Sequence, residues 1–131
     1  MVIDTSALVA IALRDASHQA LLDEVEAAPR RLISSVSLLE AGMVLRARLG
    51  EEAVPLLYQL VEELGSEIVP FNDMLARLGI AAFGRFGKGM GHRAQLNFGD
   101  CAVYALAVSL GEPLLATGND FAATDLIVIR P

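Results

Sequence analysis

Short apolar runs alternate along the chain with longer segments whose apolar positions recur at helical spacing. The apolar runs predict five strands, in "MVID", "RRLISS", "SEIVPF", "PLLAT" and "DLIVIRP". The periodic segments between them predict helices over residues 5–13, 17–28, 36–50, 52–65, 72–86 and 98–111. Because strands and helices follow one another in this order, we expect an α/β fold, a mostly parallel sheet with helices on both faces.

Composition is consistent with one compact domain spanning residues 1–131, since 54% of the residues are hydrophobic and the mean hydropathy is +0.51. No apolar run approaches the roughly 18 residues that a membrane-spanning helix needs. Asp4 stands where a secretory signal would carry positive charge, so we expect a cytoplasmic protein. Cys101 is the only cysteine, which rules out an internal disulfide and makes it a candidate core residue.

The net charge of -6 argues against a protein that coats nucleic acid through a broad positive field. Basic residues gather once, in the glycine-rich segment "RFGKGMGHR", which holds Arg85, Lys88, His92 and Arg93. This segment predicts either a flexible cationic loop that contacts RNA or an ordinary solvated connection between two helices.

Four carboxylates flank the predicted strands. Asp4 ends the first strand and Asp120 follows the fourth, while Glu40 lies early in the helix after the second strand. Asp100 opens the apolar helix that precedes the fourth strand. Because parallel sheets bind ligands beyond the carboxyl ends of their strands, we expect these four side chains to converge there.

Each of these acids also has a purely structural interpretation. Two pairs have the spacing of a capping box, Ser37 with Glu40 and Asn97 with Asp100. Two others precede expected helix starts, Asp4 before Thr5 and Asp120 before Phe121. Capping explains each acid singly, but it does not explain why all four fall where a parallel sheet collects functional groups.

Converging carboxylates repel one another, and either a raised pKa or a bound divalent cation relieves that repulsion. An oxygen-only ligand set without histidine or cysteine favours Mg²⁺ or Mn²⁺ over zinc. Such ions orient water and stabilise the charge that develops on a phosphate under attack. The predicted chemistry is therefore metal-dependent hydrolysis of a phosphodiester.

The segments "VIDTSAL", "SSVSLLE", "LNFGDCAVYALA" and "LLATGNDFAATDL" resemble the PIN-domain family, and more narrowly the VapC-type toxins of toxin–antitoxin pairs. The resemblance covers essentially the whole chain and implies a single PIN-like domain with a parallel sheet of about five strands. It also implies an Mg²⁺- or Mn²⁺-dependent endoribonuclease, a cognate antitoxin protein and a homodimer. On the matching positions, the family's catalytic and metal-binding acids are Asp4, Glu40, Asp100 and Asp120, and its supporting polar residues are Thr5, Ser6, Thr117 and Asn119.

On this reading Asp4, Asp100 and Glu40 hold the principal cation, and Asp120 binds a second ion or orients the attacking water. Cleavage leaves a 5′-phosphate and a 3′-hydroxyl. The flanking RNA backbone is expected to contact three basic residues, Arg85, Lys88 and Arg93, whereas His92 is interpreted as a surface residue.

Two positions depart from the family's usual pattern or have a variable role in it. Ala116 stands where such toxins often carry a basic or aromatic residue. Asp125 matches a frequent Thr-Asp pair, and we expect it to position its loop and not to bind metal.

Three other classes are compatible with part of the pattern. A response-regulator receiver needs a lysine late in the sheet, but the only lysine is Lys88 in the glycine-rich segment. A haloacid-dehalogenase phosphatase needs an aspartate where Ser6 stands. A non-catalytic PIN-like module that binds RNA or protein stays open. The apolar helix in "VPLLYQLVEEL" either faces the antitoxin or second copy that the resemblance implies, or completes the domain's own core.

Overall fold

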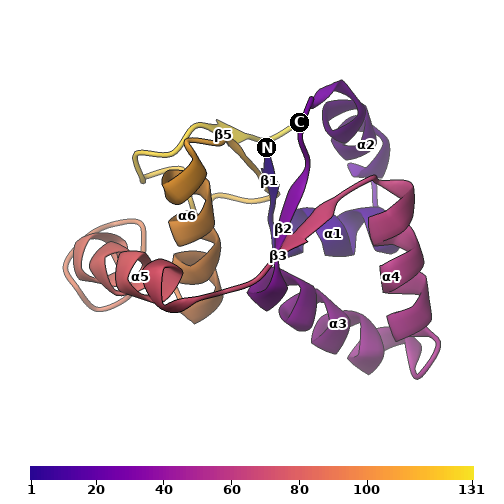
Figure 1. The fold of residues 1–131 in the computed structure, drawn as a ribbon, viewed down its shortest axis with the longest axis horizontal. Helices are drawn as coiled ribbons and strands as arrows, with labels where there is room; N and C mark the ends of the chain where they lie inside the picture. The colour runs from indigo at the N-terminus through magenta and orange to yellow at the C-terminus, as the bar shows by residue number, and fades with distance from the viewer.

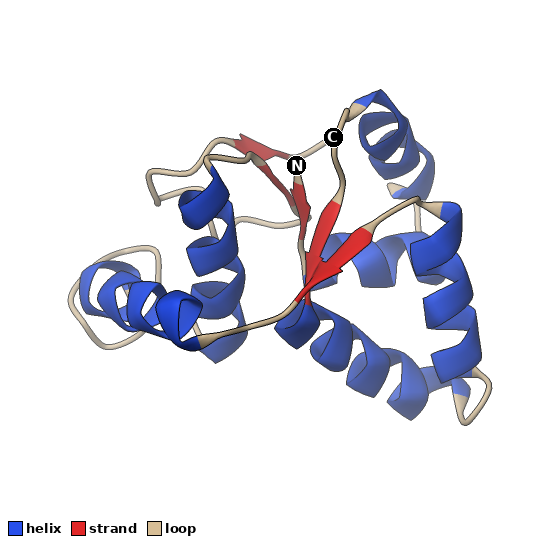
Figure 2. Cartoon of the chain, in the orientation of Figure 1, coloured by secondary structure: helices blue, strands red, loops and turns tan.

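The computed structural model describes residues 1–131 and contains one sheet of five parallel strands in the order β3-β2-β1-β4-β5. Figure 2 shows these short strands at the centre of the molecule, surrounded by helices. The strands are β1 (Val2–Ile3), β2 (Leu32–Ser34), β3 (Glu67–Val69), β4 (Leu114–Leu115) and β5 (Val128–Ile129). The predicted α/β class and the parallel five-stranded sheet are confirmed.

Six helices connect the strands, and each lies within two residues of a helix predicted from the sequence. They are α1 (Thr5–Ala12), α2 (His18–Ala27), α3 (Ser35–Leu49), α4 (Ala53–Glu63), α5 (Asp73–Phe86) and α6 (Phe98–Leu110). Helices α5 and α6 pack on one side of the sheet, and α1 to α4 pack on the other (Figure 1). None of the helices combines the length and apolar character that crossing a membrane requires.

Alternation along the strands divides the interior into two apolar clusters, because successive strand residues point to opposite faces of a sheet. One cluster joins α5 and α6 to three strand residues, Val2, Leu32 and Leu114. The other joins α1 to α4 to the residues that follow each of these, Ile3, Ile33 and Leu115. All six strand residues are fully buried, so the register of the three central strands fixes both layers of helices.

Helix starts at the carboxyl edge of the sheet differ in part from the predicted caps. Helix α3 begins at Ser35, because Ser34 ends β2 in an extended conformation and its hydroxyl accepts a hydrogen bond from the Val36 N–H at 3.2 Å. The predicted Ser37–Glu40 capping box is therefore wrong, and Glu40 lies in the second turn.

Of the other predicted helix caps, those of α1 and α6 are confirmed and the one before Phe121 is wrong. Asp4 caps α1, and Asn97 and Asp100 form the predicted capping box of α6. The helix start expected at Phe121 is absent: a series of turns follows Asp120, and the Phe121 side chain is buried.

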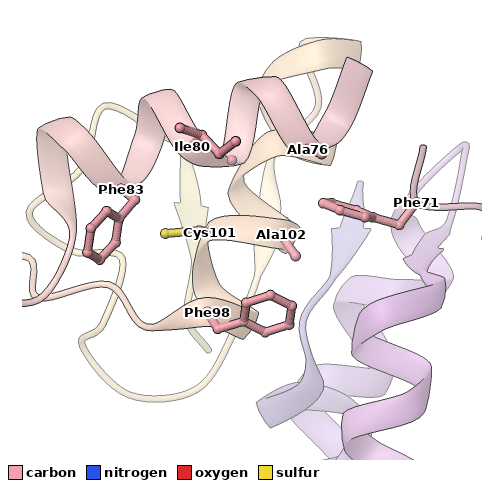
Figure 3. Close-up of a pocket in the computed structure, with 8 residues that line it drawn as sticks. Phe71, Ala76, Ile80, Phe83, Phe98, Cys101 and Ala102 are labelled. Atoms are coloured by element: carbon pink, nitrogen blue, oxygen red, sulfur yellow. The ribbon is translucent and has the colours of Figure 1, made fainter. Parts of the chain in front are cut away.

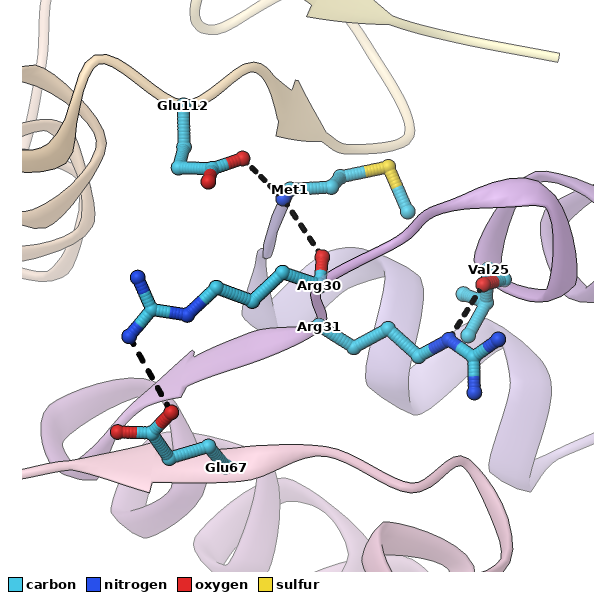
Figure 4. Close-up of polar contacts among 6 residues, drawn as sticks. All are labelled: Met1, Val25, Arg30, Arg31, Glu67 and Glu112. Carbon is cyan, nitrogen blue, oxygen red and sulfur yellow. Dashed lines mark hydrogen bonds and ion pairs between the residues drawn. The ribbon is translucent and has the colours of Figure 1, made fainter.

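An arginine at the start of β2 ties two helices to the opposite edge of the sheet. Figure 4 shows the Arg31 side chain reaching back to Val25. Its guanidinium donates to the carbonyls of Val25 at 2.7 Å and Glu26 at 3.0 Å, at the end of α2. It also donates to the carbonyl of Leu64 at 3.2 Å, beyond the end of α4. The Val25 carbonyl also accepts the Ala28 N–H at 3.2 Å, so Arg31 adds a second donor there. Carbonyls at the carboxyl end of a helix lack a full set of intrahelical donors, and a cation beside them complements the helix dipole.

The neighbouring Arg30 makes weaker side-chain contacts. Its guanidinium lies 3.3 Å from the Glu67 carboxylate, and both side chains are more than half exposed (Figure 4). Its backbone carbonyl accepts a hydrogen bond from the amine of Met1 at 2.8 Å, and that amine also pairs with Glu112. The two adjacent arginines therefore offer a matched comparison of a carbonyl-capping side chain with a surface ion pair.

We predict that Arg31→Ala lowers the free energy of unfolding by about 1.5–3 kcal/mol, because three charge-assisted contacts to helix-end carbonyls are lost. The matched Arg30→Ala variant loses an exposed ion pair and should lower it by less than about 1 kcal/mol. Urea unfolding followed by circular dichroism measures both values. Equal losses in the two variants would contradict this account of Arg31.

Candidate active site

A pocket of about 500 Å³ at the carboxyl edge of the sheet brings the four predicted carboxylates together. They come from four separate segments: Asp4 follows β1, Glu40 lies on α3, Asp100 opens α6 and Asp120 follows β4. The rest of the lining is Thr5, Ser6, Val9, Ala10, Leu13, Asp15, Val44, Arg48, Asn97 and Thr117. Strand ends and helix starts therefore position the acids, as expected for a parallel sheet.

Asp4 is the most enclosed of the four, with a relative exposure of 8%. Its Oδ2 accepts hydrogen bonds from the Ser6 N–H at 2.9 Å and from the Ser6 hydroxyl at 2.6 Å. The Ser6 hydroxyl oxygen in turn accepts the Thr117 N–H at 3.0 Å, which links α1 to the segment after β4. Burial raises the pKa of Asp4, the hydrogen bonds from Ser6 oppose that rise, and the charge of Glu40 adds to it.

Asp100 combines a structural contact with a place in the charged pocket. It forms a reciprocal capping box with Asn97, in which both N–H to oxygen distances are 2.9 Å. Burial raises the pKa of Asp100 to about 6, against the opposing hydrogen bond from the Asn97 N–H. The charges of Asp4, Asp120 and Glu40 raise the pKa further. The capping box therefore fixes the orientation of this carboxylate at a place where burial and neighbouring charges disfavour its ionised form.

Glu40 lies against the first turn of α6, at Gly99. A Cβ atom built on Gly99 would come within 2.4 Å of Glu40 Oε2 and 3.1 Å of its Cδ. Glycine at this position therefore leaves the space that the glutamate carboxylate occupies. The amino end of a helix also favours a nearby negative charge. Sequence reasoning missed Gly99, although it stands in the quoted motif "FGDC".

The donor chemistry of the pocket fits a hard divalent cation. Five carboxylates line it, the four above and Asp15, together with hydroxyl and amide groups and without histidine or cysteine. No three acidic, histidine or cysteine side chains lie close enough together to hold an ion as they stand. The carboxylates are instead turned toward their own hydrogen-bond donors, Asp4 to Ser6 and Asp100 to Asn97. The pocket therefore contains the right ligand types in a dispersed arrangement.

The supporting polar residues divide between the pocket and its surroundings. Thr5, Ser6 and Thr117 line the pocket. Asn119 does not, and its side-chain oxygen instead accepts a hydrogen bond from Arg130. Sequence reasoning missed the contributions of Asp15, Arg48 and the Asn97 side chain to the lining, because no motif marks them.

The basic residues predicted to contact RNA lie away from the carboxylates, since Arg85, Lys88 and Arg93 are not among the lining residues. Arg85 lies 3.3 Å from the Asp125 carboxylate, which also accepts a hydrogen bond from the Tyr104 hydroxyl at 2.6 Å. Lys88 and Arg93 are exposed on the glycine-rich segment.

His92 has a local structural role in the same segment. Its Nδ1 accepts a hydrogen bond from the Ala94 N–H at 3.0 Å, and its ring packs edge-on against Phe86 at 4.9 Å. Nothing in the geometry connects His92 with the carboxylate pocket.

A second pocket of about 500 Å³ lies between α5 and α6 and is almost wholly apolar. Figure 3 shows side chains from α5, from α6 and from the segment after β3 around it. Its lining residues are Phe71, Ala76, Gly79, Ile80, Phe83, Phe98, Cys101 and Ala102. Burial raises the pKa of the Cys101 thiol, which disfavours the reactive thiolate. This pocket therefore offers no titratable group suited to hydrolysis.

Comparison with known proteins agrees with this geometry. The family model described as "PIN domain" matches residues 1–126. Ribonuclease VapC28 of Mycobacterium tuberculosis is 43% identical over 124 residues, covering 95% of this chain and 93% of the relative.

Solved structures show the same fold. VapC20 of M. tuberculosis, described as a sarcin–ricin loop cleaving toxin, superposes with a TM-score of 0.81 at 20% identity, covering 99% of this chain and 98% of that one. A chain of the VapBC2 structure from Rickettsia felis, bound to a promoter DNA fragment, superposes with a TM-score of 0.77 at 17% identity, covering 98% of this chain and 96% of that one. With the match to the family model and the identity to VapC28, these observations establish that the chain belongs to the PIN-domain family and, within it, to the VapC ribonucleases.

Proposed function

We propose that Asp4, Glu40, Asp100 and Asp120 form the active site at which this protein hydrolyses RNA. The protein is an endoribonuclease of the toxin–antitoxin class, as its membership of the VapC ribonucleases shows. The observation that carries the assignment of the site is the gathering of four carboxylates from four segments into one pocket. Metal-assisted phosphodiester hydrolysis uses such a group of oxygen ligands, and the apolar pocket between α5 and α6 offers none.

Nucleases of this family are generally metal-dependent, and we propose Mg²⁺ or Mn²⁺ as the ion here. The support is the oxygen-only ligand set, which these hard cations prefer. A divalent cation held among the carboxylates supplies an activated water and stabilises the charge that develops on the phosphate. Asp4, Glu40 and Asp100 would hold this cation, and its charge would offset the burial and neighbouring charge that disfavour the ionised form of Asp100.

The individual roles follow from position. Asp4 is enclosed and oriented by Ser6, so it is suited to a fixed ligand that changes little during turnover. Asp100 is oriented by its capping box and is half-buried, which suits a second fixed ligand. Asp120 is exposed on a turn beyond β4, so it has the freedom to accept a second ion or to orient the attacking water. Cleavage by water leaves a 5′-phosphate and a 3′-hydroxyl.

We also propose a cognate antitoxin and a homodimer as the protein's assemblies. The antitoxin is supported by the structural likeness to VapBC2 and to a toxin–antitoxin complex from Klebsiella pneumoniae. Large apolar side chains exposed on the helices offer surface for either contact, among them Leu39, Met43, Leu56, Tyr58 and Ile80. Sedimentation of the protein with and without a co-expressed antitoxin separates the two assemblies.

We predict that Asp100→Asn lowers the rate of RNA cleavage at least 100-fold, because the amide retains the acceptor for Asn97 but loses the charge that binds the cation. The assay incubates purified protein with a pool of structured and single-stranded RNA in Mg²⁺ or Mn²⁺ and maps the ends of the products. Cleavage that survives a chelator or this substitution would contradict the assignment. A folded wild-type protein that cuts no RNA would favour the non-catalytic module instead.

The raised pKa of Asp100 predicts how stability depends on pH in the metal-free protein. A carboxyl whose pKa rises on folding, from 3.8 to about 6, contributes stability below pH 4 that is lost as the pH rises through 6. We therefore expect Asp100→Asn to melt at a higher temperature than wild type at pH 7.5 and at a similar temperature at pH 4. Mn²⁺ should raise the melting temperature of wild type more than that of the variant. A wild-type protein that is the more stable of the two at pH 7.5 without metal would contradict this interpretation.

The close approach at Gly99 predicts a loss of activity without a loss of stability. Gly99→Ala should displace the Glu40 carboxylate and lower cleavage by about 100-fold, the cost of misplacing a catalytic group by an ångström. Alanine is favoured over glycine in a helix by about 1 kcal/mol, so the variant should stay folded.

Gly84→Ala is the matched control for Gly99→Ala, because a Cβ at Gly84 on α5 meets nothing within 4 Å. It should be as stable as wild type or more stable and fully active. Thermal melts and initial cleavage rates of both variants make the comparison. Equal activity in the two variants would show that Glu40 is not constrained by α6.

A further inference from the structure

Arg48 lies on the same face of α3 as the active-site residue Glu40. Glu40, Val44 and Arg48 follow one another at intervals of four residues, and all three line the carboxylate pocket. A helix rises by 1.5 Å per residue, so Arg48 stands roughly 12 Å along α3 from Glu40. It therefore borders the site without standing among the proposed metal ligands.

Arg48 is the only basic residue in the lining of that pocket, and its guanidinium is uncommitted. Five carboxylates share the lining with it, yet it forms no ion pair and no side-chain hydrogen bond. Four of the chain's ten basic residues lack such a partner, namely Arg14, Arg48, Lys88 and Arg93. Of these four, only Arg48 lies in the pocket.

Arg46, in the same turn of α3, offers a comparison because its guanidinium has an ion-pair partner. Arg46 pairs with Glu51 at 3.4 Å and borders a different pocket, between α3 and α4. Both arginines lie in the last turn of α3, where the helix dipole favours cations. The dipole therefore accounts for a basic residue at either position, but it does not account for a free guanidinium beside the acids.

We propose that Arg48 binds an RNA phosphate next to the scissile one and so holds the strand across the carboxylate pocket. This assignment rests on the proposed ribonuclease function of that pocket. A guanidinium makes paired, charge-assisted hydrogen bonds to a phosphate, and an arginine on a helix offers them from a fixed origin. The separation along α3 places Arg48 beside the reacting phosphate, so it is a positioning residue and not a catalytic one. The basic residues predicted from sequence to serve this purpose, Arg85, Lys88 and Arg93, lie outside the pocket.

The test compares Arg48→Ala, Arg48→Lys and the matched control Arg46→Ala in two assays. Cleavage of a short single-stranded RNA at saturating Mn²⁺ gives KM and kcat. Fluorescence anisotropy of the same RNA, with each substitution placed in the Asp100→Asn background, gives Kd over a range of salt concentrations.

For Arg48→Ala we expect KM and Kd to rise about tenfold, the loss of one charge-assisted contact, with kcat changed less than twofold. The slope of log Kd against log salt should fall by about 0.7, the value for one phosphate contact on a single strand. Arg48→Lys should recover part of the affinity and the full slope, since its charge remains. Arg46→Ala should match wild type in the cleavage assay, and in the binding assay it should match the Asp100→Asn protein without it.

Three results would overturn the assignment. The first is an unchanged Kd and salt slope in Arg48→Ala. The second is a fall in kcat at constant KM, which would make the residue part of the chemistry. The third is intact RNA binding with weakened binding of the cognate antitoxin, which would place Arg48 in a protein interface. A wild-type protein that binds this RNA but cleaves none contradicts the proposed function instead, and the anisotropy values still decide the role of Arg48.

Discussion

The burial of Asp4 and Asp100 beside other carboxylates is the constraint on which the rest of this structure depends. Four segments carry Asp4, Glu40, Asp100 and Asp120 to one pocket, where burial and mutual charge raise the pKa of Asp100 to about 6. Packing elsewhere must supply the free energy that holds them there. It comes from the two apolar clusters on either face of the sheet, which fix the strand ends from which the acids project. A pocket that collects buried and neighbouring carboxylates is suited to binding a cation, which favours their ionised forms.

The contacts that orient the acids are local and serve the fold as well as the site. Asp4 caps α1 and accepts the Ser6 N–H, while Asn97 caps α6 and Asp100 completes the capping box by accepting the Asn97 N–H. The Ser6 hydroxyl extends the first of these contacts to Thr117, beyond β4, so one small side chain joins two of the segments. The structural and the functional interpretations of the acids are therefore not alternatives. Capping supplies the orientation, and the convergence of the strands supplies the chemistry.

Hydrophobic periodicity was sufficient to predict the strands, the six helices and the two-faced sheet, because each element buries one regular stripe or face. The Asn97–Asp100 capping box was predictable for the same reason, since its geometry depends on residues three apart. Ser37 and Glu40 have the same spacing but lie inside α3, because Ser34 at the end of β2 begins the helix earlier. Local spacing cannot distinguish these cases without the strand that precedes the helix.

The pocket-lining residues other than the four motif acids could not be predicted from the sequence, because tertiary packing brings them to the site. Arg48 and Asp15 carry no motif, and only the packing of α1 against α3 brings them to the site. Arg85 looked available in the sequence, but it is paired with Asp125 in the structure. Gly99 stood in a quoted motif, yet its importance lies in its distance from Glu40, a residue on another helix. Contacts between segments far apart in sequence determine these features, and a single sequence does not encode them in any local pattern.

Anomalous X-ray diffraction from crystals of the metal-free protein soaked in Mn²⁺ tests the central claim most directly. The account predicts anomalous density in the carboxylate pocket, with Asp4, Glu40 and Asp100 drawn toward the ion from their dispersed positions. Density at another place on the molecule, or a pocket that stays empty at saturating Mn²⁺ with its carboxylates unmoved, would contradict it.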